Sequence, residues 1–316
     1  MNEKLDIIAI GESLVELSSD SHLRDTDCLK KYYGGDALSV AVAASRMGSS
    51  VGFISRVGDD VFKDYLLDSW QTEGLDISQV KISQEQNGVY FIARPEGASK
   101  EFAYYRKRIA PAKLSLDDIS EDYISNSKAV YASGITQSLS LSAKEAVAES
   151  FKIAKKNGII TAYDPNYSAS ITTPETAKED FNKVINDIDI LFMSAKYDTT
   201  NILELNSVEN IIKRIWDMGV GTVVIKASPD GGYYTGYNGN IVFTEFYAHD
   251  VVDTTCSGDA FNGGFLHAIT HGLTPIEASR FASIVAGLQA KSIGAIKSIP
   301  YKDEVYEIFE KGVFNA

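Results

Sequence analysis

The 316-residue sequence lacks the features that mark several classes of protein. Its two cysteines, Cys28 and Cys256, lie far apart and give neither a disulfide framework nor a zinc-ligand spacing. It has no run of 18 apolar residues, and its first residues, MNEKLDIIAIGE, pass directly from polar residues into a strand-like segment, so we expect no membrane span and no signal peptide. With 30 Lys and Arg against 43 Asp and Glu, the chain is also poor in the cations that bind nucleic acid. We therefore expect a cytoplasmic protein with no nucleic-acid or membrane partner.

Histidine is equally scarce, with four residues and no metal-binding motif. His267 and His271 lie four residues apart on a predicted helix, but no acidic partner accompanies them, and we interpret both as structural. The sequence thus assigns no metal ligand.

What the sequence does contain is a regular alternation of strand-like and helix-like segments, which predicts right-handed βαβ units and a mainly parallel sheet covered on both faces. Several helical segments end on glycine, at Gly48, Gly74, Gly158 and Gly219, as helices commonly do. The predicted strands are residues 7–10, 51–55, 129–131, 159–163, 190–193 and 222–225, and the predicted helices are residues 37–47, 61–73, 143–157, 208–218 and 275–291.

Three segments break this alternation, because their apolar and polar residues alternate with a period of two. They are residues 12–18, 89–94 and 101–106, with a hairpin turn expected at 95–99. We expect them to form a small β-sheet lid inserted between the βαβ units.

Residues 251–265, VVDTTCSGDAFNGGF, carry the strongest indication of function. They predict a strand, a tight turn and the start of a buried helix, whose free N–H groups would suit a phosphate. Asp259 would lie in the first helical turn, where its carboxylate could take a proton from a substrate hydroxyl. The alternative is that Asp259 only caps the helix, and this window alone does not decide between the two.

Other candidate ligand residues lie at a glycine turn and on the expected lid strands. Gly34 and Gly35 would let backbone approach a ligand closely, and Asp36 could accept hydrogen bonds from sugar hydroxyls or serve only as a helix N-cap. Tyr104 and Arg106 share one strand face. A guanidinium beside a phenol suits the carboxylate of a small acid, although Arg106 could equally belong to a solvated, charged sheet edge.

Two further loops follow predicted strands, at the sheet edge where ligands bind in open parallel sheets. Residues 164–168, Asp-Pro-Asn-Tyr-Ser, belong to such a loop or form a plain Asp-Pro turn. Lys226 ends another strand, and residues 227–232 after it are typical of a nucleotide contact or of a simple hairpin.

With these motifs, the sequence resembles the ribokinase-like (PfkB) carbohydrate kinases over essentially its whole length. The two signature regions of that family match the segment from Gly34-Gly35 through residues 58–60 and the segment 253–259, DTTCSGD. The resemblance implies an anion hole at Cys256, Ser257 and Gly258 and a catalytic base at Asp259. The expected fold is an α/β ribokinase-like three-layer sandwich, in a single domain of residues 1–316 with a discontinuous β-lid at about 12–18, 30–36 and 86–108.

Within the family, the sequence is most similar to the 2-keto-3-deoxygluconate kinases, which implies transfer of the γ-phosphate of ATP to a primary hydroxyl, giving the 6-phosphate. Arg106 would face the carboxylate of the sugar acid. ATP and Mg²⁺ are implied, with an optional monovalent cation such as K⁺. The implied sugar contacts are Gly34, Gly35, Asp36, Tyr90, Tyr104, Arg106, Asn166 and Asp259, and the implied nucleotide contacts are Asn166, Ser194, Lys226, Ser228, Asp230, Gly231, Gly232, Ser257 and Gly258.

Four positions depart from the family pattern. The usual Gly-Ala-Gly of the anion hole reads Cys-Ser-Gly, which requires a positive φ at Cys256. Ser168 stands where an arginine is expected, the Asn-x-x-Glu motif is not intact around residues 194–198, and Ser228 replaces a glycine of the nucleotide loop.

The change at Ser168 favours an alternative substrate, fructose or 5-dehydro-2-deoxygluconate. A third interpretation is a sugar-acid-binding protein of the same fold without activity, which the presence of Asp259 disfavours. Because Phe91, Phe102 and Tyr105 would otherwise be exposed on the lid, we also expect a homodimer formed through it.

Overall fold

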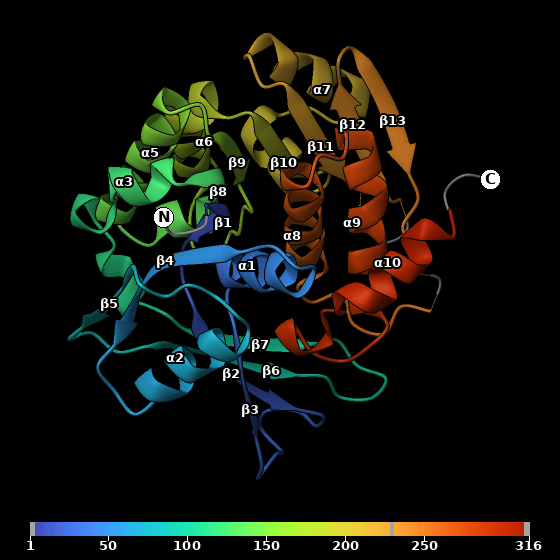
Figure 1. Cartoon of the computed structure of the whole chain (residues 1–316). Coiled ribbons are helices and arrows are strands. Elements are labelled where there is room, and N and C mark those ends of the chain that lie inside the picture. The colour runs from blue at the N-terminus through green and yellow to red at the C-terminus, as the bar shows by residue number, and fades with distance from the viewer. Residues whose placement is uncertain (1–3, 228–230, 249, 313–316) are drawn as a thin grey trace.

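A nine-stranded sheet forms the centre of the structure (Figure 1). The computed structural model describes residues 4–227, 231–248 and 250–312. The strands of this sheet are β1 (Leu5–Ile10), β4 (Val51–Gly58), β5 (Val80–Ser83), β8 (Ser127–Ser133), β9 (Ile160–Asp164), β10 (Ile190–Ser194), β11 (Thr222–Lys226), β12 (Tyr233–Tyr237) and β13 (Asn240–Thr244). Their order is β13-β12-β11-β10-β9-β8-β1-β4-β5. Neighbouring strands run parallel except at β11–β12 and β12–β13, so the sheet is mainly parallel, as predicted.

Both faces of the central part of this sheet are buried, because its inner strands are largely apolar and their side chains alternate between the faces. In β1, Ile7 and Ala9 belong to one buried cluster, and Ile8 and Ile10 belong to the other. The first cluster includes apolar residues of α1 (Asp36–Arg46), α8 (Ser257–Thr270) and α9 (Pro275–Ala290). The second includes apolar residues of α5 (Leu141–Lys156), α6 (Pro174–Val184) and α7 (Val208–Asp217). The result is the expected arrangement of helices on both faces of a sheet.

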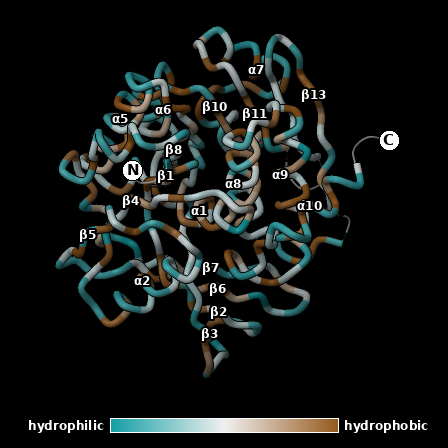
Figure 2. The backbone as a smooth tube through the Cα atoms, viewed as in Figure 1, coloured by the Kyte–Doolittle hydropathy of each residue, from teal (hydrophilic) through white to brown (hydrophobic). Residues whose placement is uncertain are grey.

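The remaining helices are short or peripheral, and Figure 2 shows hydrophilic stretches at the outer loops and helices. They are α2 (Lys63–Thr72), α3 (Glu121–Ser125), α4 (Gly134–Ser138) and α10 (Lys302–Glu310). Single helical turns cover Ala110–Lys113, Leu116–Asp118, Ile185–Asp187, Thr199–Leu203 and Ile296–Ser298. Among the described residues, no helix is both long enough and apolar enough to cross a membrane.

A separate four-stranded sheet lies beside α1, below the large sheet in Figure 1. Its strands are β2 (Leu14–Ser19), β3 (Lys30–Gly34), β6 (Gly88–Ala93) and β7 (Glu101–Tyr105), in the order β3-β2-β6-β7. Tyr90 in β6 pairs with Glu16 on one side and with Tyr104 on the other, so these three side chains share a face. Phe102 lies on that same face and lines a cavity, whereas Tyr105 contacts Phe91 on the opposite face. The expectation that all three aromatic residues share one exposed face was therefore wrong.

Each strand and helix of the predicted alternation has an observed counterpart, but the strand expected at the start of residues 251–265 was wrong, because Val251 and Val252 are exposed and belong to no strand. The four glycines expected to end helices, at positions 48, 74, 158 and 219, all have positive φ. The sequence did not predict α6, α10 or the antiparallel edge strands β12 and β13. β11 and β12, which flank residues 227–232, pair as antiparallel neighbours, as in a hairpin, and the nucleotide contact of this loop stays a prediction.

The helices α1 and α8, which pack on the same face of the large sheet, approach each other closely at Gly263. A Cβ atom on Gly263 of α8 would lie 2.5 Å from the carbonyl oxygen of Val40 and 2.6 Å from the Cβ of Ala43, both in α1. No larger residue fits at Gly263 unless one of the helices moves. This contact fixes the position of α8 relative to α1.

Candidate active site

A cavity of about 270 Å³ lies between the small sheet, the start of α1 and the start of α8. It brings together most of the residues that the sequence predicted as sugar contacts. Those lining it are Gly35, Asp36, Tyr90, Tyr104, Arg106, Asn166 and Asp259, together with Cys256 from the predicted anion hole. Gly34 does not line the cavity; a Cβ atom there would lie 2.8 Å from the hydroxyl of Tyr90, so Gly34 makes room for that ring.

The turn before α8 has the predicted backbone conformation. Cys256 is the N-cap, with φ 75° and ψ 0°, a left-handed conformation that costs an L-residue about 1–2 kcal/mol. The N–H of Ser257 already donates to the carbonyl of Thr254 at 3.1 Å. Among the described residues, the N–H groups of Gly258 and Asp259 have no backbone acceptor outside the helix, as is usual in a first helical turn. They are therefore the donors that this helix offers to an anion.

Asp259 lies in this first turn and is half-buried, with its carboxylate on the cavity. Within the described residues, its carboxylate makes neither an ion pair nor a hydrogen bond. Burial raises the pKa of Asp259 well above its usual value, and the carboxylates of Asp36 and Asp164 raise it further, against the opposing effect of Lys226. An acid whose pKa is raised in this way is able to accept a proton at neutral pH.

Asp36 is the first residue of α1, and Gly35 is the N-cap, so the interpretation of Asp36 as the cap is wrong. One carboxylate oxygen accepts a hydrogen bond from the hydroxyl of Ser133. The other, Oδ1, is buried and has no hydrogen-bond partner among the described residues. Because Asp36 lines the cavity, this oxygen is available to a ligand hydroxyl.

Arg106 and Tyr104 lie together on the cavity wall, as the shared strand face predicted. The guanidinium lies 4.7 Å from the centre of the Tyr104 ring, which stacks on Tyr90 with 5.5 Å between ring centres. Its Nη1 donates to Oε1 of Glu12 at 2.7 Å, and the Arg106 side chain is only 15% exposed. A solvated edge charge would be far more exposed, so that alternative is wrong. The other N–H groups of Arg106 remain for a ligand.

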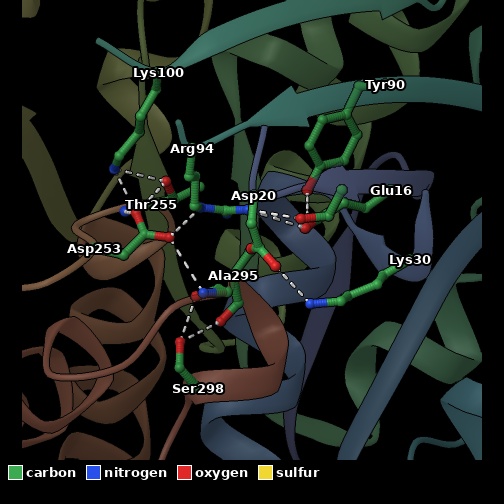
Figure 3. Close-up of polar contacts among 12 residues, drawn as sticks. Glu16, Asp20, Lys30, Tyr90, Arg94, Lys100, Asp253, Thr255, Ala295 and Ser298 are labelled. Carbon is green, nitrogen blue, oxygen red and sulfur yellow. Dashed lines mark hydrogen bonds and ion pairs between the residues drawn. The ribbon is translucent and has the colours of Figure 1, made fainter. Parts of the chain in front are cut away.

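A chain of polar contacts joins this cavity to the turn before α8 (Figure 3). The hydroxyl of Tyr90 donates to Glu16, and Nη1 of Arg94 lies 3.8 Å from Glu16. Nε of Arg94 donates to Asp253 at 2.7 Å, and the ammonium of Lys100 also contacts Asp253. Arg94 and Lys100 both belong to the small sheet and its β6–β7 loop, so this sheet is tied directly to the segment 253–259.

Of the predicted nucleotide residues that the structure describes, Asn166 lines the cavity, and the others lie outside its lining. Ser194 and Lys226 are register neighbours at the ends of β10 and β11. A Cβ atom on Gly258 would lie 3.4 Å from Nζ of Lys226, so Lys226 adjoins the start of α8. Gly231 and Gly232 form the end of the β11–β12 loop, where Ala227 N–H donates to the Gly232 carbonyl at 2.9 Å. Ser228 and Asp230 lie outside the described residues.

The sequence placed Asp164 in a candidate ligand loop and Asp198 in an altered motif, but it assigned neither of them as a site residue. Asp164 accepts hydrogen bonds from Lys226 and, at 2.6 Å, from Nδ2 of Asn262. Asp198 accepts from the backbone of Ser194 at 2.6 Å and of Tyr167 at 2.7 Å. Burial and the Asp164 charge raise the pKa of Asp198 to about 7. Asp164 follows a predicted strand, so its position could have identified it.

Comparison with known proteins gives one family and consistent relatives. The family described as "pfkB family carbohydrate kinase" matches residues 4–302. A 5-dehydro-2-deoxygluconokinase of Clostridium perfringens is 28% identical, over 98% of this chain and 94% of its own. A 2-dehydro-3-deoxygluconokinase of Thermoproteus tenax is 29% identical, over 97% of this chain and 94% of its own.

Solved structures agree with this result. A sugar kinase of Pyrococcus horikoshii in complex with ATP is 28% identical, with a TM-score of 0.79 over 95% of this chain and 97% of that chain. Ribokinase of Thermotoga maritima, at 22% identity, has a TM-score of 0.82 over 98% of this chain and 100% of that chain. The ribokinase-like fold predicted from the sequence is confirmed.

Proposed function

The chain belongs to the pfkB family of carbohydrate kinases, and on that premise we propose that it phosphorylates a primary hydroxyl of a sugar acid with ATP. The preferred candidate is 2-keto-3-deoxygluconate, converted to its 6-phosphate. One observation carries this proposal: Arg106, a cation suited to a carboxylate, and Asp259, an acid suited to a hydroxyl, line the same cavity.

In this proposal the sugar lies between the small sheet and the start of α8. Arg106 binds the carboxylate through the N–H groups that Glu12 does not use. Oδ1 of Asp36 accepts a hydrogen bond from a sugar hydroxyl. The carboxylate of Asp259 takes the proton from the hydroxyl that attacks, and the N–H groups of Gly258 and Asp259 hold the phosphoryl oxygens.

The nucleotide would lie on the far side of the turn, near Ser194 and Lys226. The ammonium of Lys226 adjoins Gly258 and supplies positive charge for the ATP phosphates. Among the described residues, no three His, Cys, Asp or Glu side chains are arranged to ligate a metal. That fits Mg²⁺, which keeps much of its water and is held largely by substrate phosphates, with Asp164 and Asp198 as the nearby carboxylates. When bound, Mg²⁺ neutralises phosphate charge.

The alternative substrates are 5-dehydro-2-deoxygluconate, which is also a sugar acid, and a neutral sugar such as fructose, and the cavity lining bears on the second of these. Ser168 and Ser170 line the cavity where the family pattern has an arginine, and their hydroxyls bond to each other at 2.8 Å. Arg106 is then the only guanidinium of the cavity lining described here, and Glu12 partly balances its charge. This weakens the preference for a sugar acid without removing it.

We further propose that the chain forms a single domain in which the small sheet is a lid over the sugar site. We also propose that the outer face of this sheet contacts the same face of a second copy of the chain in a homodimer. Tyr105 is 68% exposed beside Phe91, which gives that face an apolar surface.

The test is an assay of ADP production with purified protein and separate sugars: 2-keto-3-deoxygluconate, 5-dehydro-2-deoxygluconate, fructose and none. We expect kcat/KM to be highest for a sugar acid, by about tenfold to a hundredfold over fructose, the value of a charge-assisted contact. Phosphorus NMR of the product identifies the phosphorylated hydroxyl. Equal turnover of fructose would contradict the sugar-acid assignment, and sugar binding without turnover would favour the binding protein.

A further inference from the structure

The side chain of Gln289 lies in an unusual oxygen-rich site beside the turn. Gln289 belongs to α9 and is fully buried. Its Nε2 atom lies 2.7 Å from the carbonyl oxygen of Thr255, 3.0 Å from that of Gly294 and 2.9 Å from the hydroxyl of Ser298. Three oxygens, one from the turn at Thr255 and two from the segment 294–298, therefore converge on one nitrogen, which has only two hydrogens to donate.

The orientation of this amide is fixed by those oxygens. Turning the group over would bring its own oxygen against three acceptors. In the observed orientation Oε1 of Gln289 is buried with no partner among the described residues, a situation that is unfavourable in itself. The site thus keeps an N–H donor facing the oxygens at the expense of an unpaired carbonyl.

The carboxylate of Asp253, at the start of the same turn, already has cationic partners within the protein. Asp253 is held by Arg94 at 2.7 Å and by the ammonium of Lys100, which lies 3.1 Å from the hydroxyl of Thr255 as well (Figure 3). Burial alone would raise the pKa of Asp253, but its hydrogen bonds to Lys100 and Thr255 and the charge of Arg94 lower it to about 2. The carboxylate is therefore ionised and paired.

These residues do not fit the monovalent cation that the resemblance made optional. An ion of that kind is held by oxygens that replace its water shell. Here the converging oxygens already receive N–H groups from Gln289, and the adjacent carboxylate already has two protein cations. An added K⁺ would have to displace the amide and would meet Lys100 and Arg94 as like charges.

We propose that Gln289 and Lys100 are positioning residues that hold the 253–259 turn in its phosphate-binding shape, in place of a monovalent cation, so that the protein binds ATP without K⁺. The carbonyl that Gln289 holds belongs to Thr255, the residue directly before the left-handed Cys256. The proposal rests on the phosphate-holding role proposed above for this turn.

The first experiment compares the wild-type protein in KCl and in tetramethylammonium chloride at equal ionic strength. Affinity for Mg·ATP is measured by calorimetry without sugar, and the midpoint of thermal unfolding is measured without ligand. We expect the affinities to agree within about twofold and the midpoints to coincide, because no site couples the ion to the turn. Tighter binding in KCl by about fivefold or more would overturn the proposal. Failure to bind ATP in either salt would instead refute the proposed function.

Variants then test the two residues. Gln289→Met keeps most of the volume but removes the donor, and Gln289→Ala opens space among the three oxygens. Loss of a buried hydrogen bond should weaken Mg·ATP binding about three- to tenfold in both. KCl should restore affinity in Gln289→Ala and not in Gln289→Met. Wild-type affinity in a folded Gln289→Met protein would overturn the role of Gln289.

Lys100→Met provides a second variant that should fold, because this side chain is 32% exposed. It should weaken Mg·ATP binding and make it sensitive to KCl. The matched control is Lys30→Met in β3, an exposed lysine whose hydrogen bond is to Asp20 and not to Asp253 (Figure 3). Equal effects of the two substitutions would show that Lys100 contributes only surface charge.

Discussion

Ionisation of Glu12 should control how tightly the cavity binds a carboxylate. Glu12 is buried, pairs with Arg106 at 2.7 Å and has an unpartnered oxygen, Oε2, among the described residues. Burial raises its pKa to about 7; the nearby charge of Asp36 raises it as well, whereas Arg106 lowers it. When Glu12 is protonated, Arg106 keeps a net positive charge for a ligand. When Glu12 is ionised, the Arg106–Glu12 pair has no net charge, and it attracts the carboxylate of a ligand less strongly.

The size of the effect follows from the fraction of protein with protonated Glu12. With a pKa of about 7, about ten-elevenths of the molecules are protonated at pH 6 and about one-eleventh at pH 8. The apparent affinity for a sugar acid should therefore fall about tenfold over this range, because apparent affinity scales with the competent fraction. Glu12→Gln retains a hydrogen bond to Arg106 but cannot ionise, so its affinity should stay level.

Calorimetric titration of 2-keto-3-deoxygluconate without ATP measures this directly between pH 6 and pH 8. Fructose is the neutral control and should bind with little pH dependence. The carboxyls of Asp36 and Asp259 also face the cavity with raised pKa values, and the Gln variant separates their contribution from that of Glu12. A wild-type affinity that is constant across this range, or an equal slope in Glu12→Gln, would refute the reasoning.

Four other results are expected. Asp259→Asn should lower kcat by about 10²–10⁴ and leave sugar binding measured by calorimetry nearly intact; turnover close to wild type would exclude Asp259 as the base. Arg106→Ala should raise KM for the sugar acid about tenfold to a hundredfold with KM for ATP unchanged, since a charge-assisted hydrogen bond is lost; an equal rise in both would indicate a folding defect. Glu73→Ala leaves Arg46 unpaired in a site where both side chains are under 10% exposed, and should lower the free energy of unfolding in urea by about 3–5 kcal/mol; a loss below about 1 kcal/mol, as for a surface pair, would contradict this. Sedimentation at micromolar concentration should show a dimer that Tyr105→Glu converts to monomer, and a wild-type monomer would end the dimer proposal.

The sequence predicted the large sheet well because local patterns determine it. Strands such as β10 and β11 are mostly apolar, and several of the helices between strands are followed by glycines with positive φ. Residues directly after strands, such as Asn166 and Lys226, were found for the same reason, since ligand sites of parallel sheets lie at those ends.

Contacts between distant segments could not be predicted in this way. The partner of Arg106 is Glu12, which precedes it by 94 residues and meets it only because the small sheet docks on the large one. Gln289 likewise meets the carbonyl of Thr255, which precedes it by 34 residues, only in the folded chain. Charge and size indicate what such side chains can bind, but which atoms they meet depends on the completed fold.

The contact of Gly263 with α1 has a consequence for how substrate range can change during evolution. Asp36 and Asp259 lie in the first turns of α1 and α8. The distance between these two helices is set by the close approach of their backbones at Gly263, so it does not depend on side-chain rotamers. Tyr104 belongs instead to a separate sheet, and Arg106 directly follows its strand β7. Mutations in that sheet can therefore replace one sugar by another while the reacting groups keep their separation. New specificities become accessible by steps that leave the chemistry intact, and a lineage can explore them without first passing through an inactive enzyme.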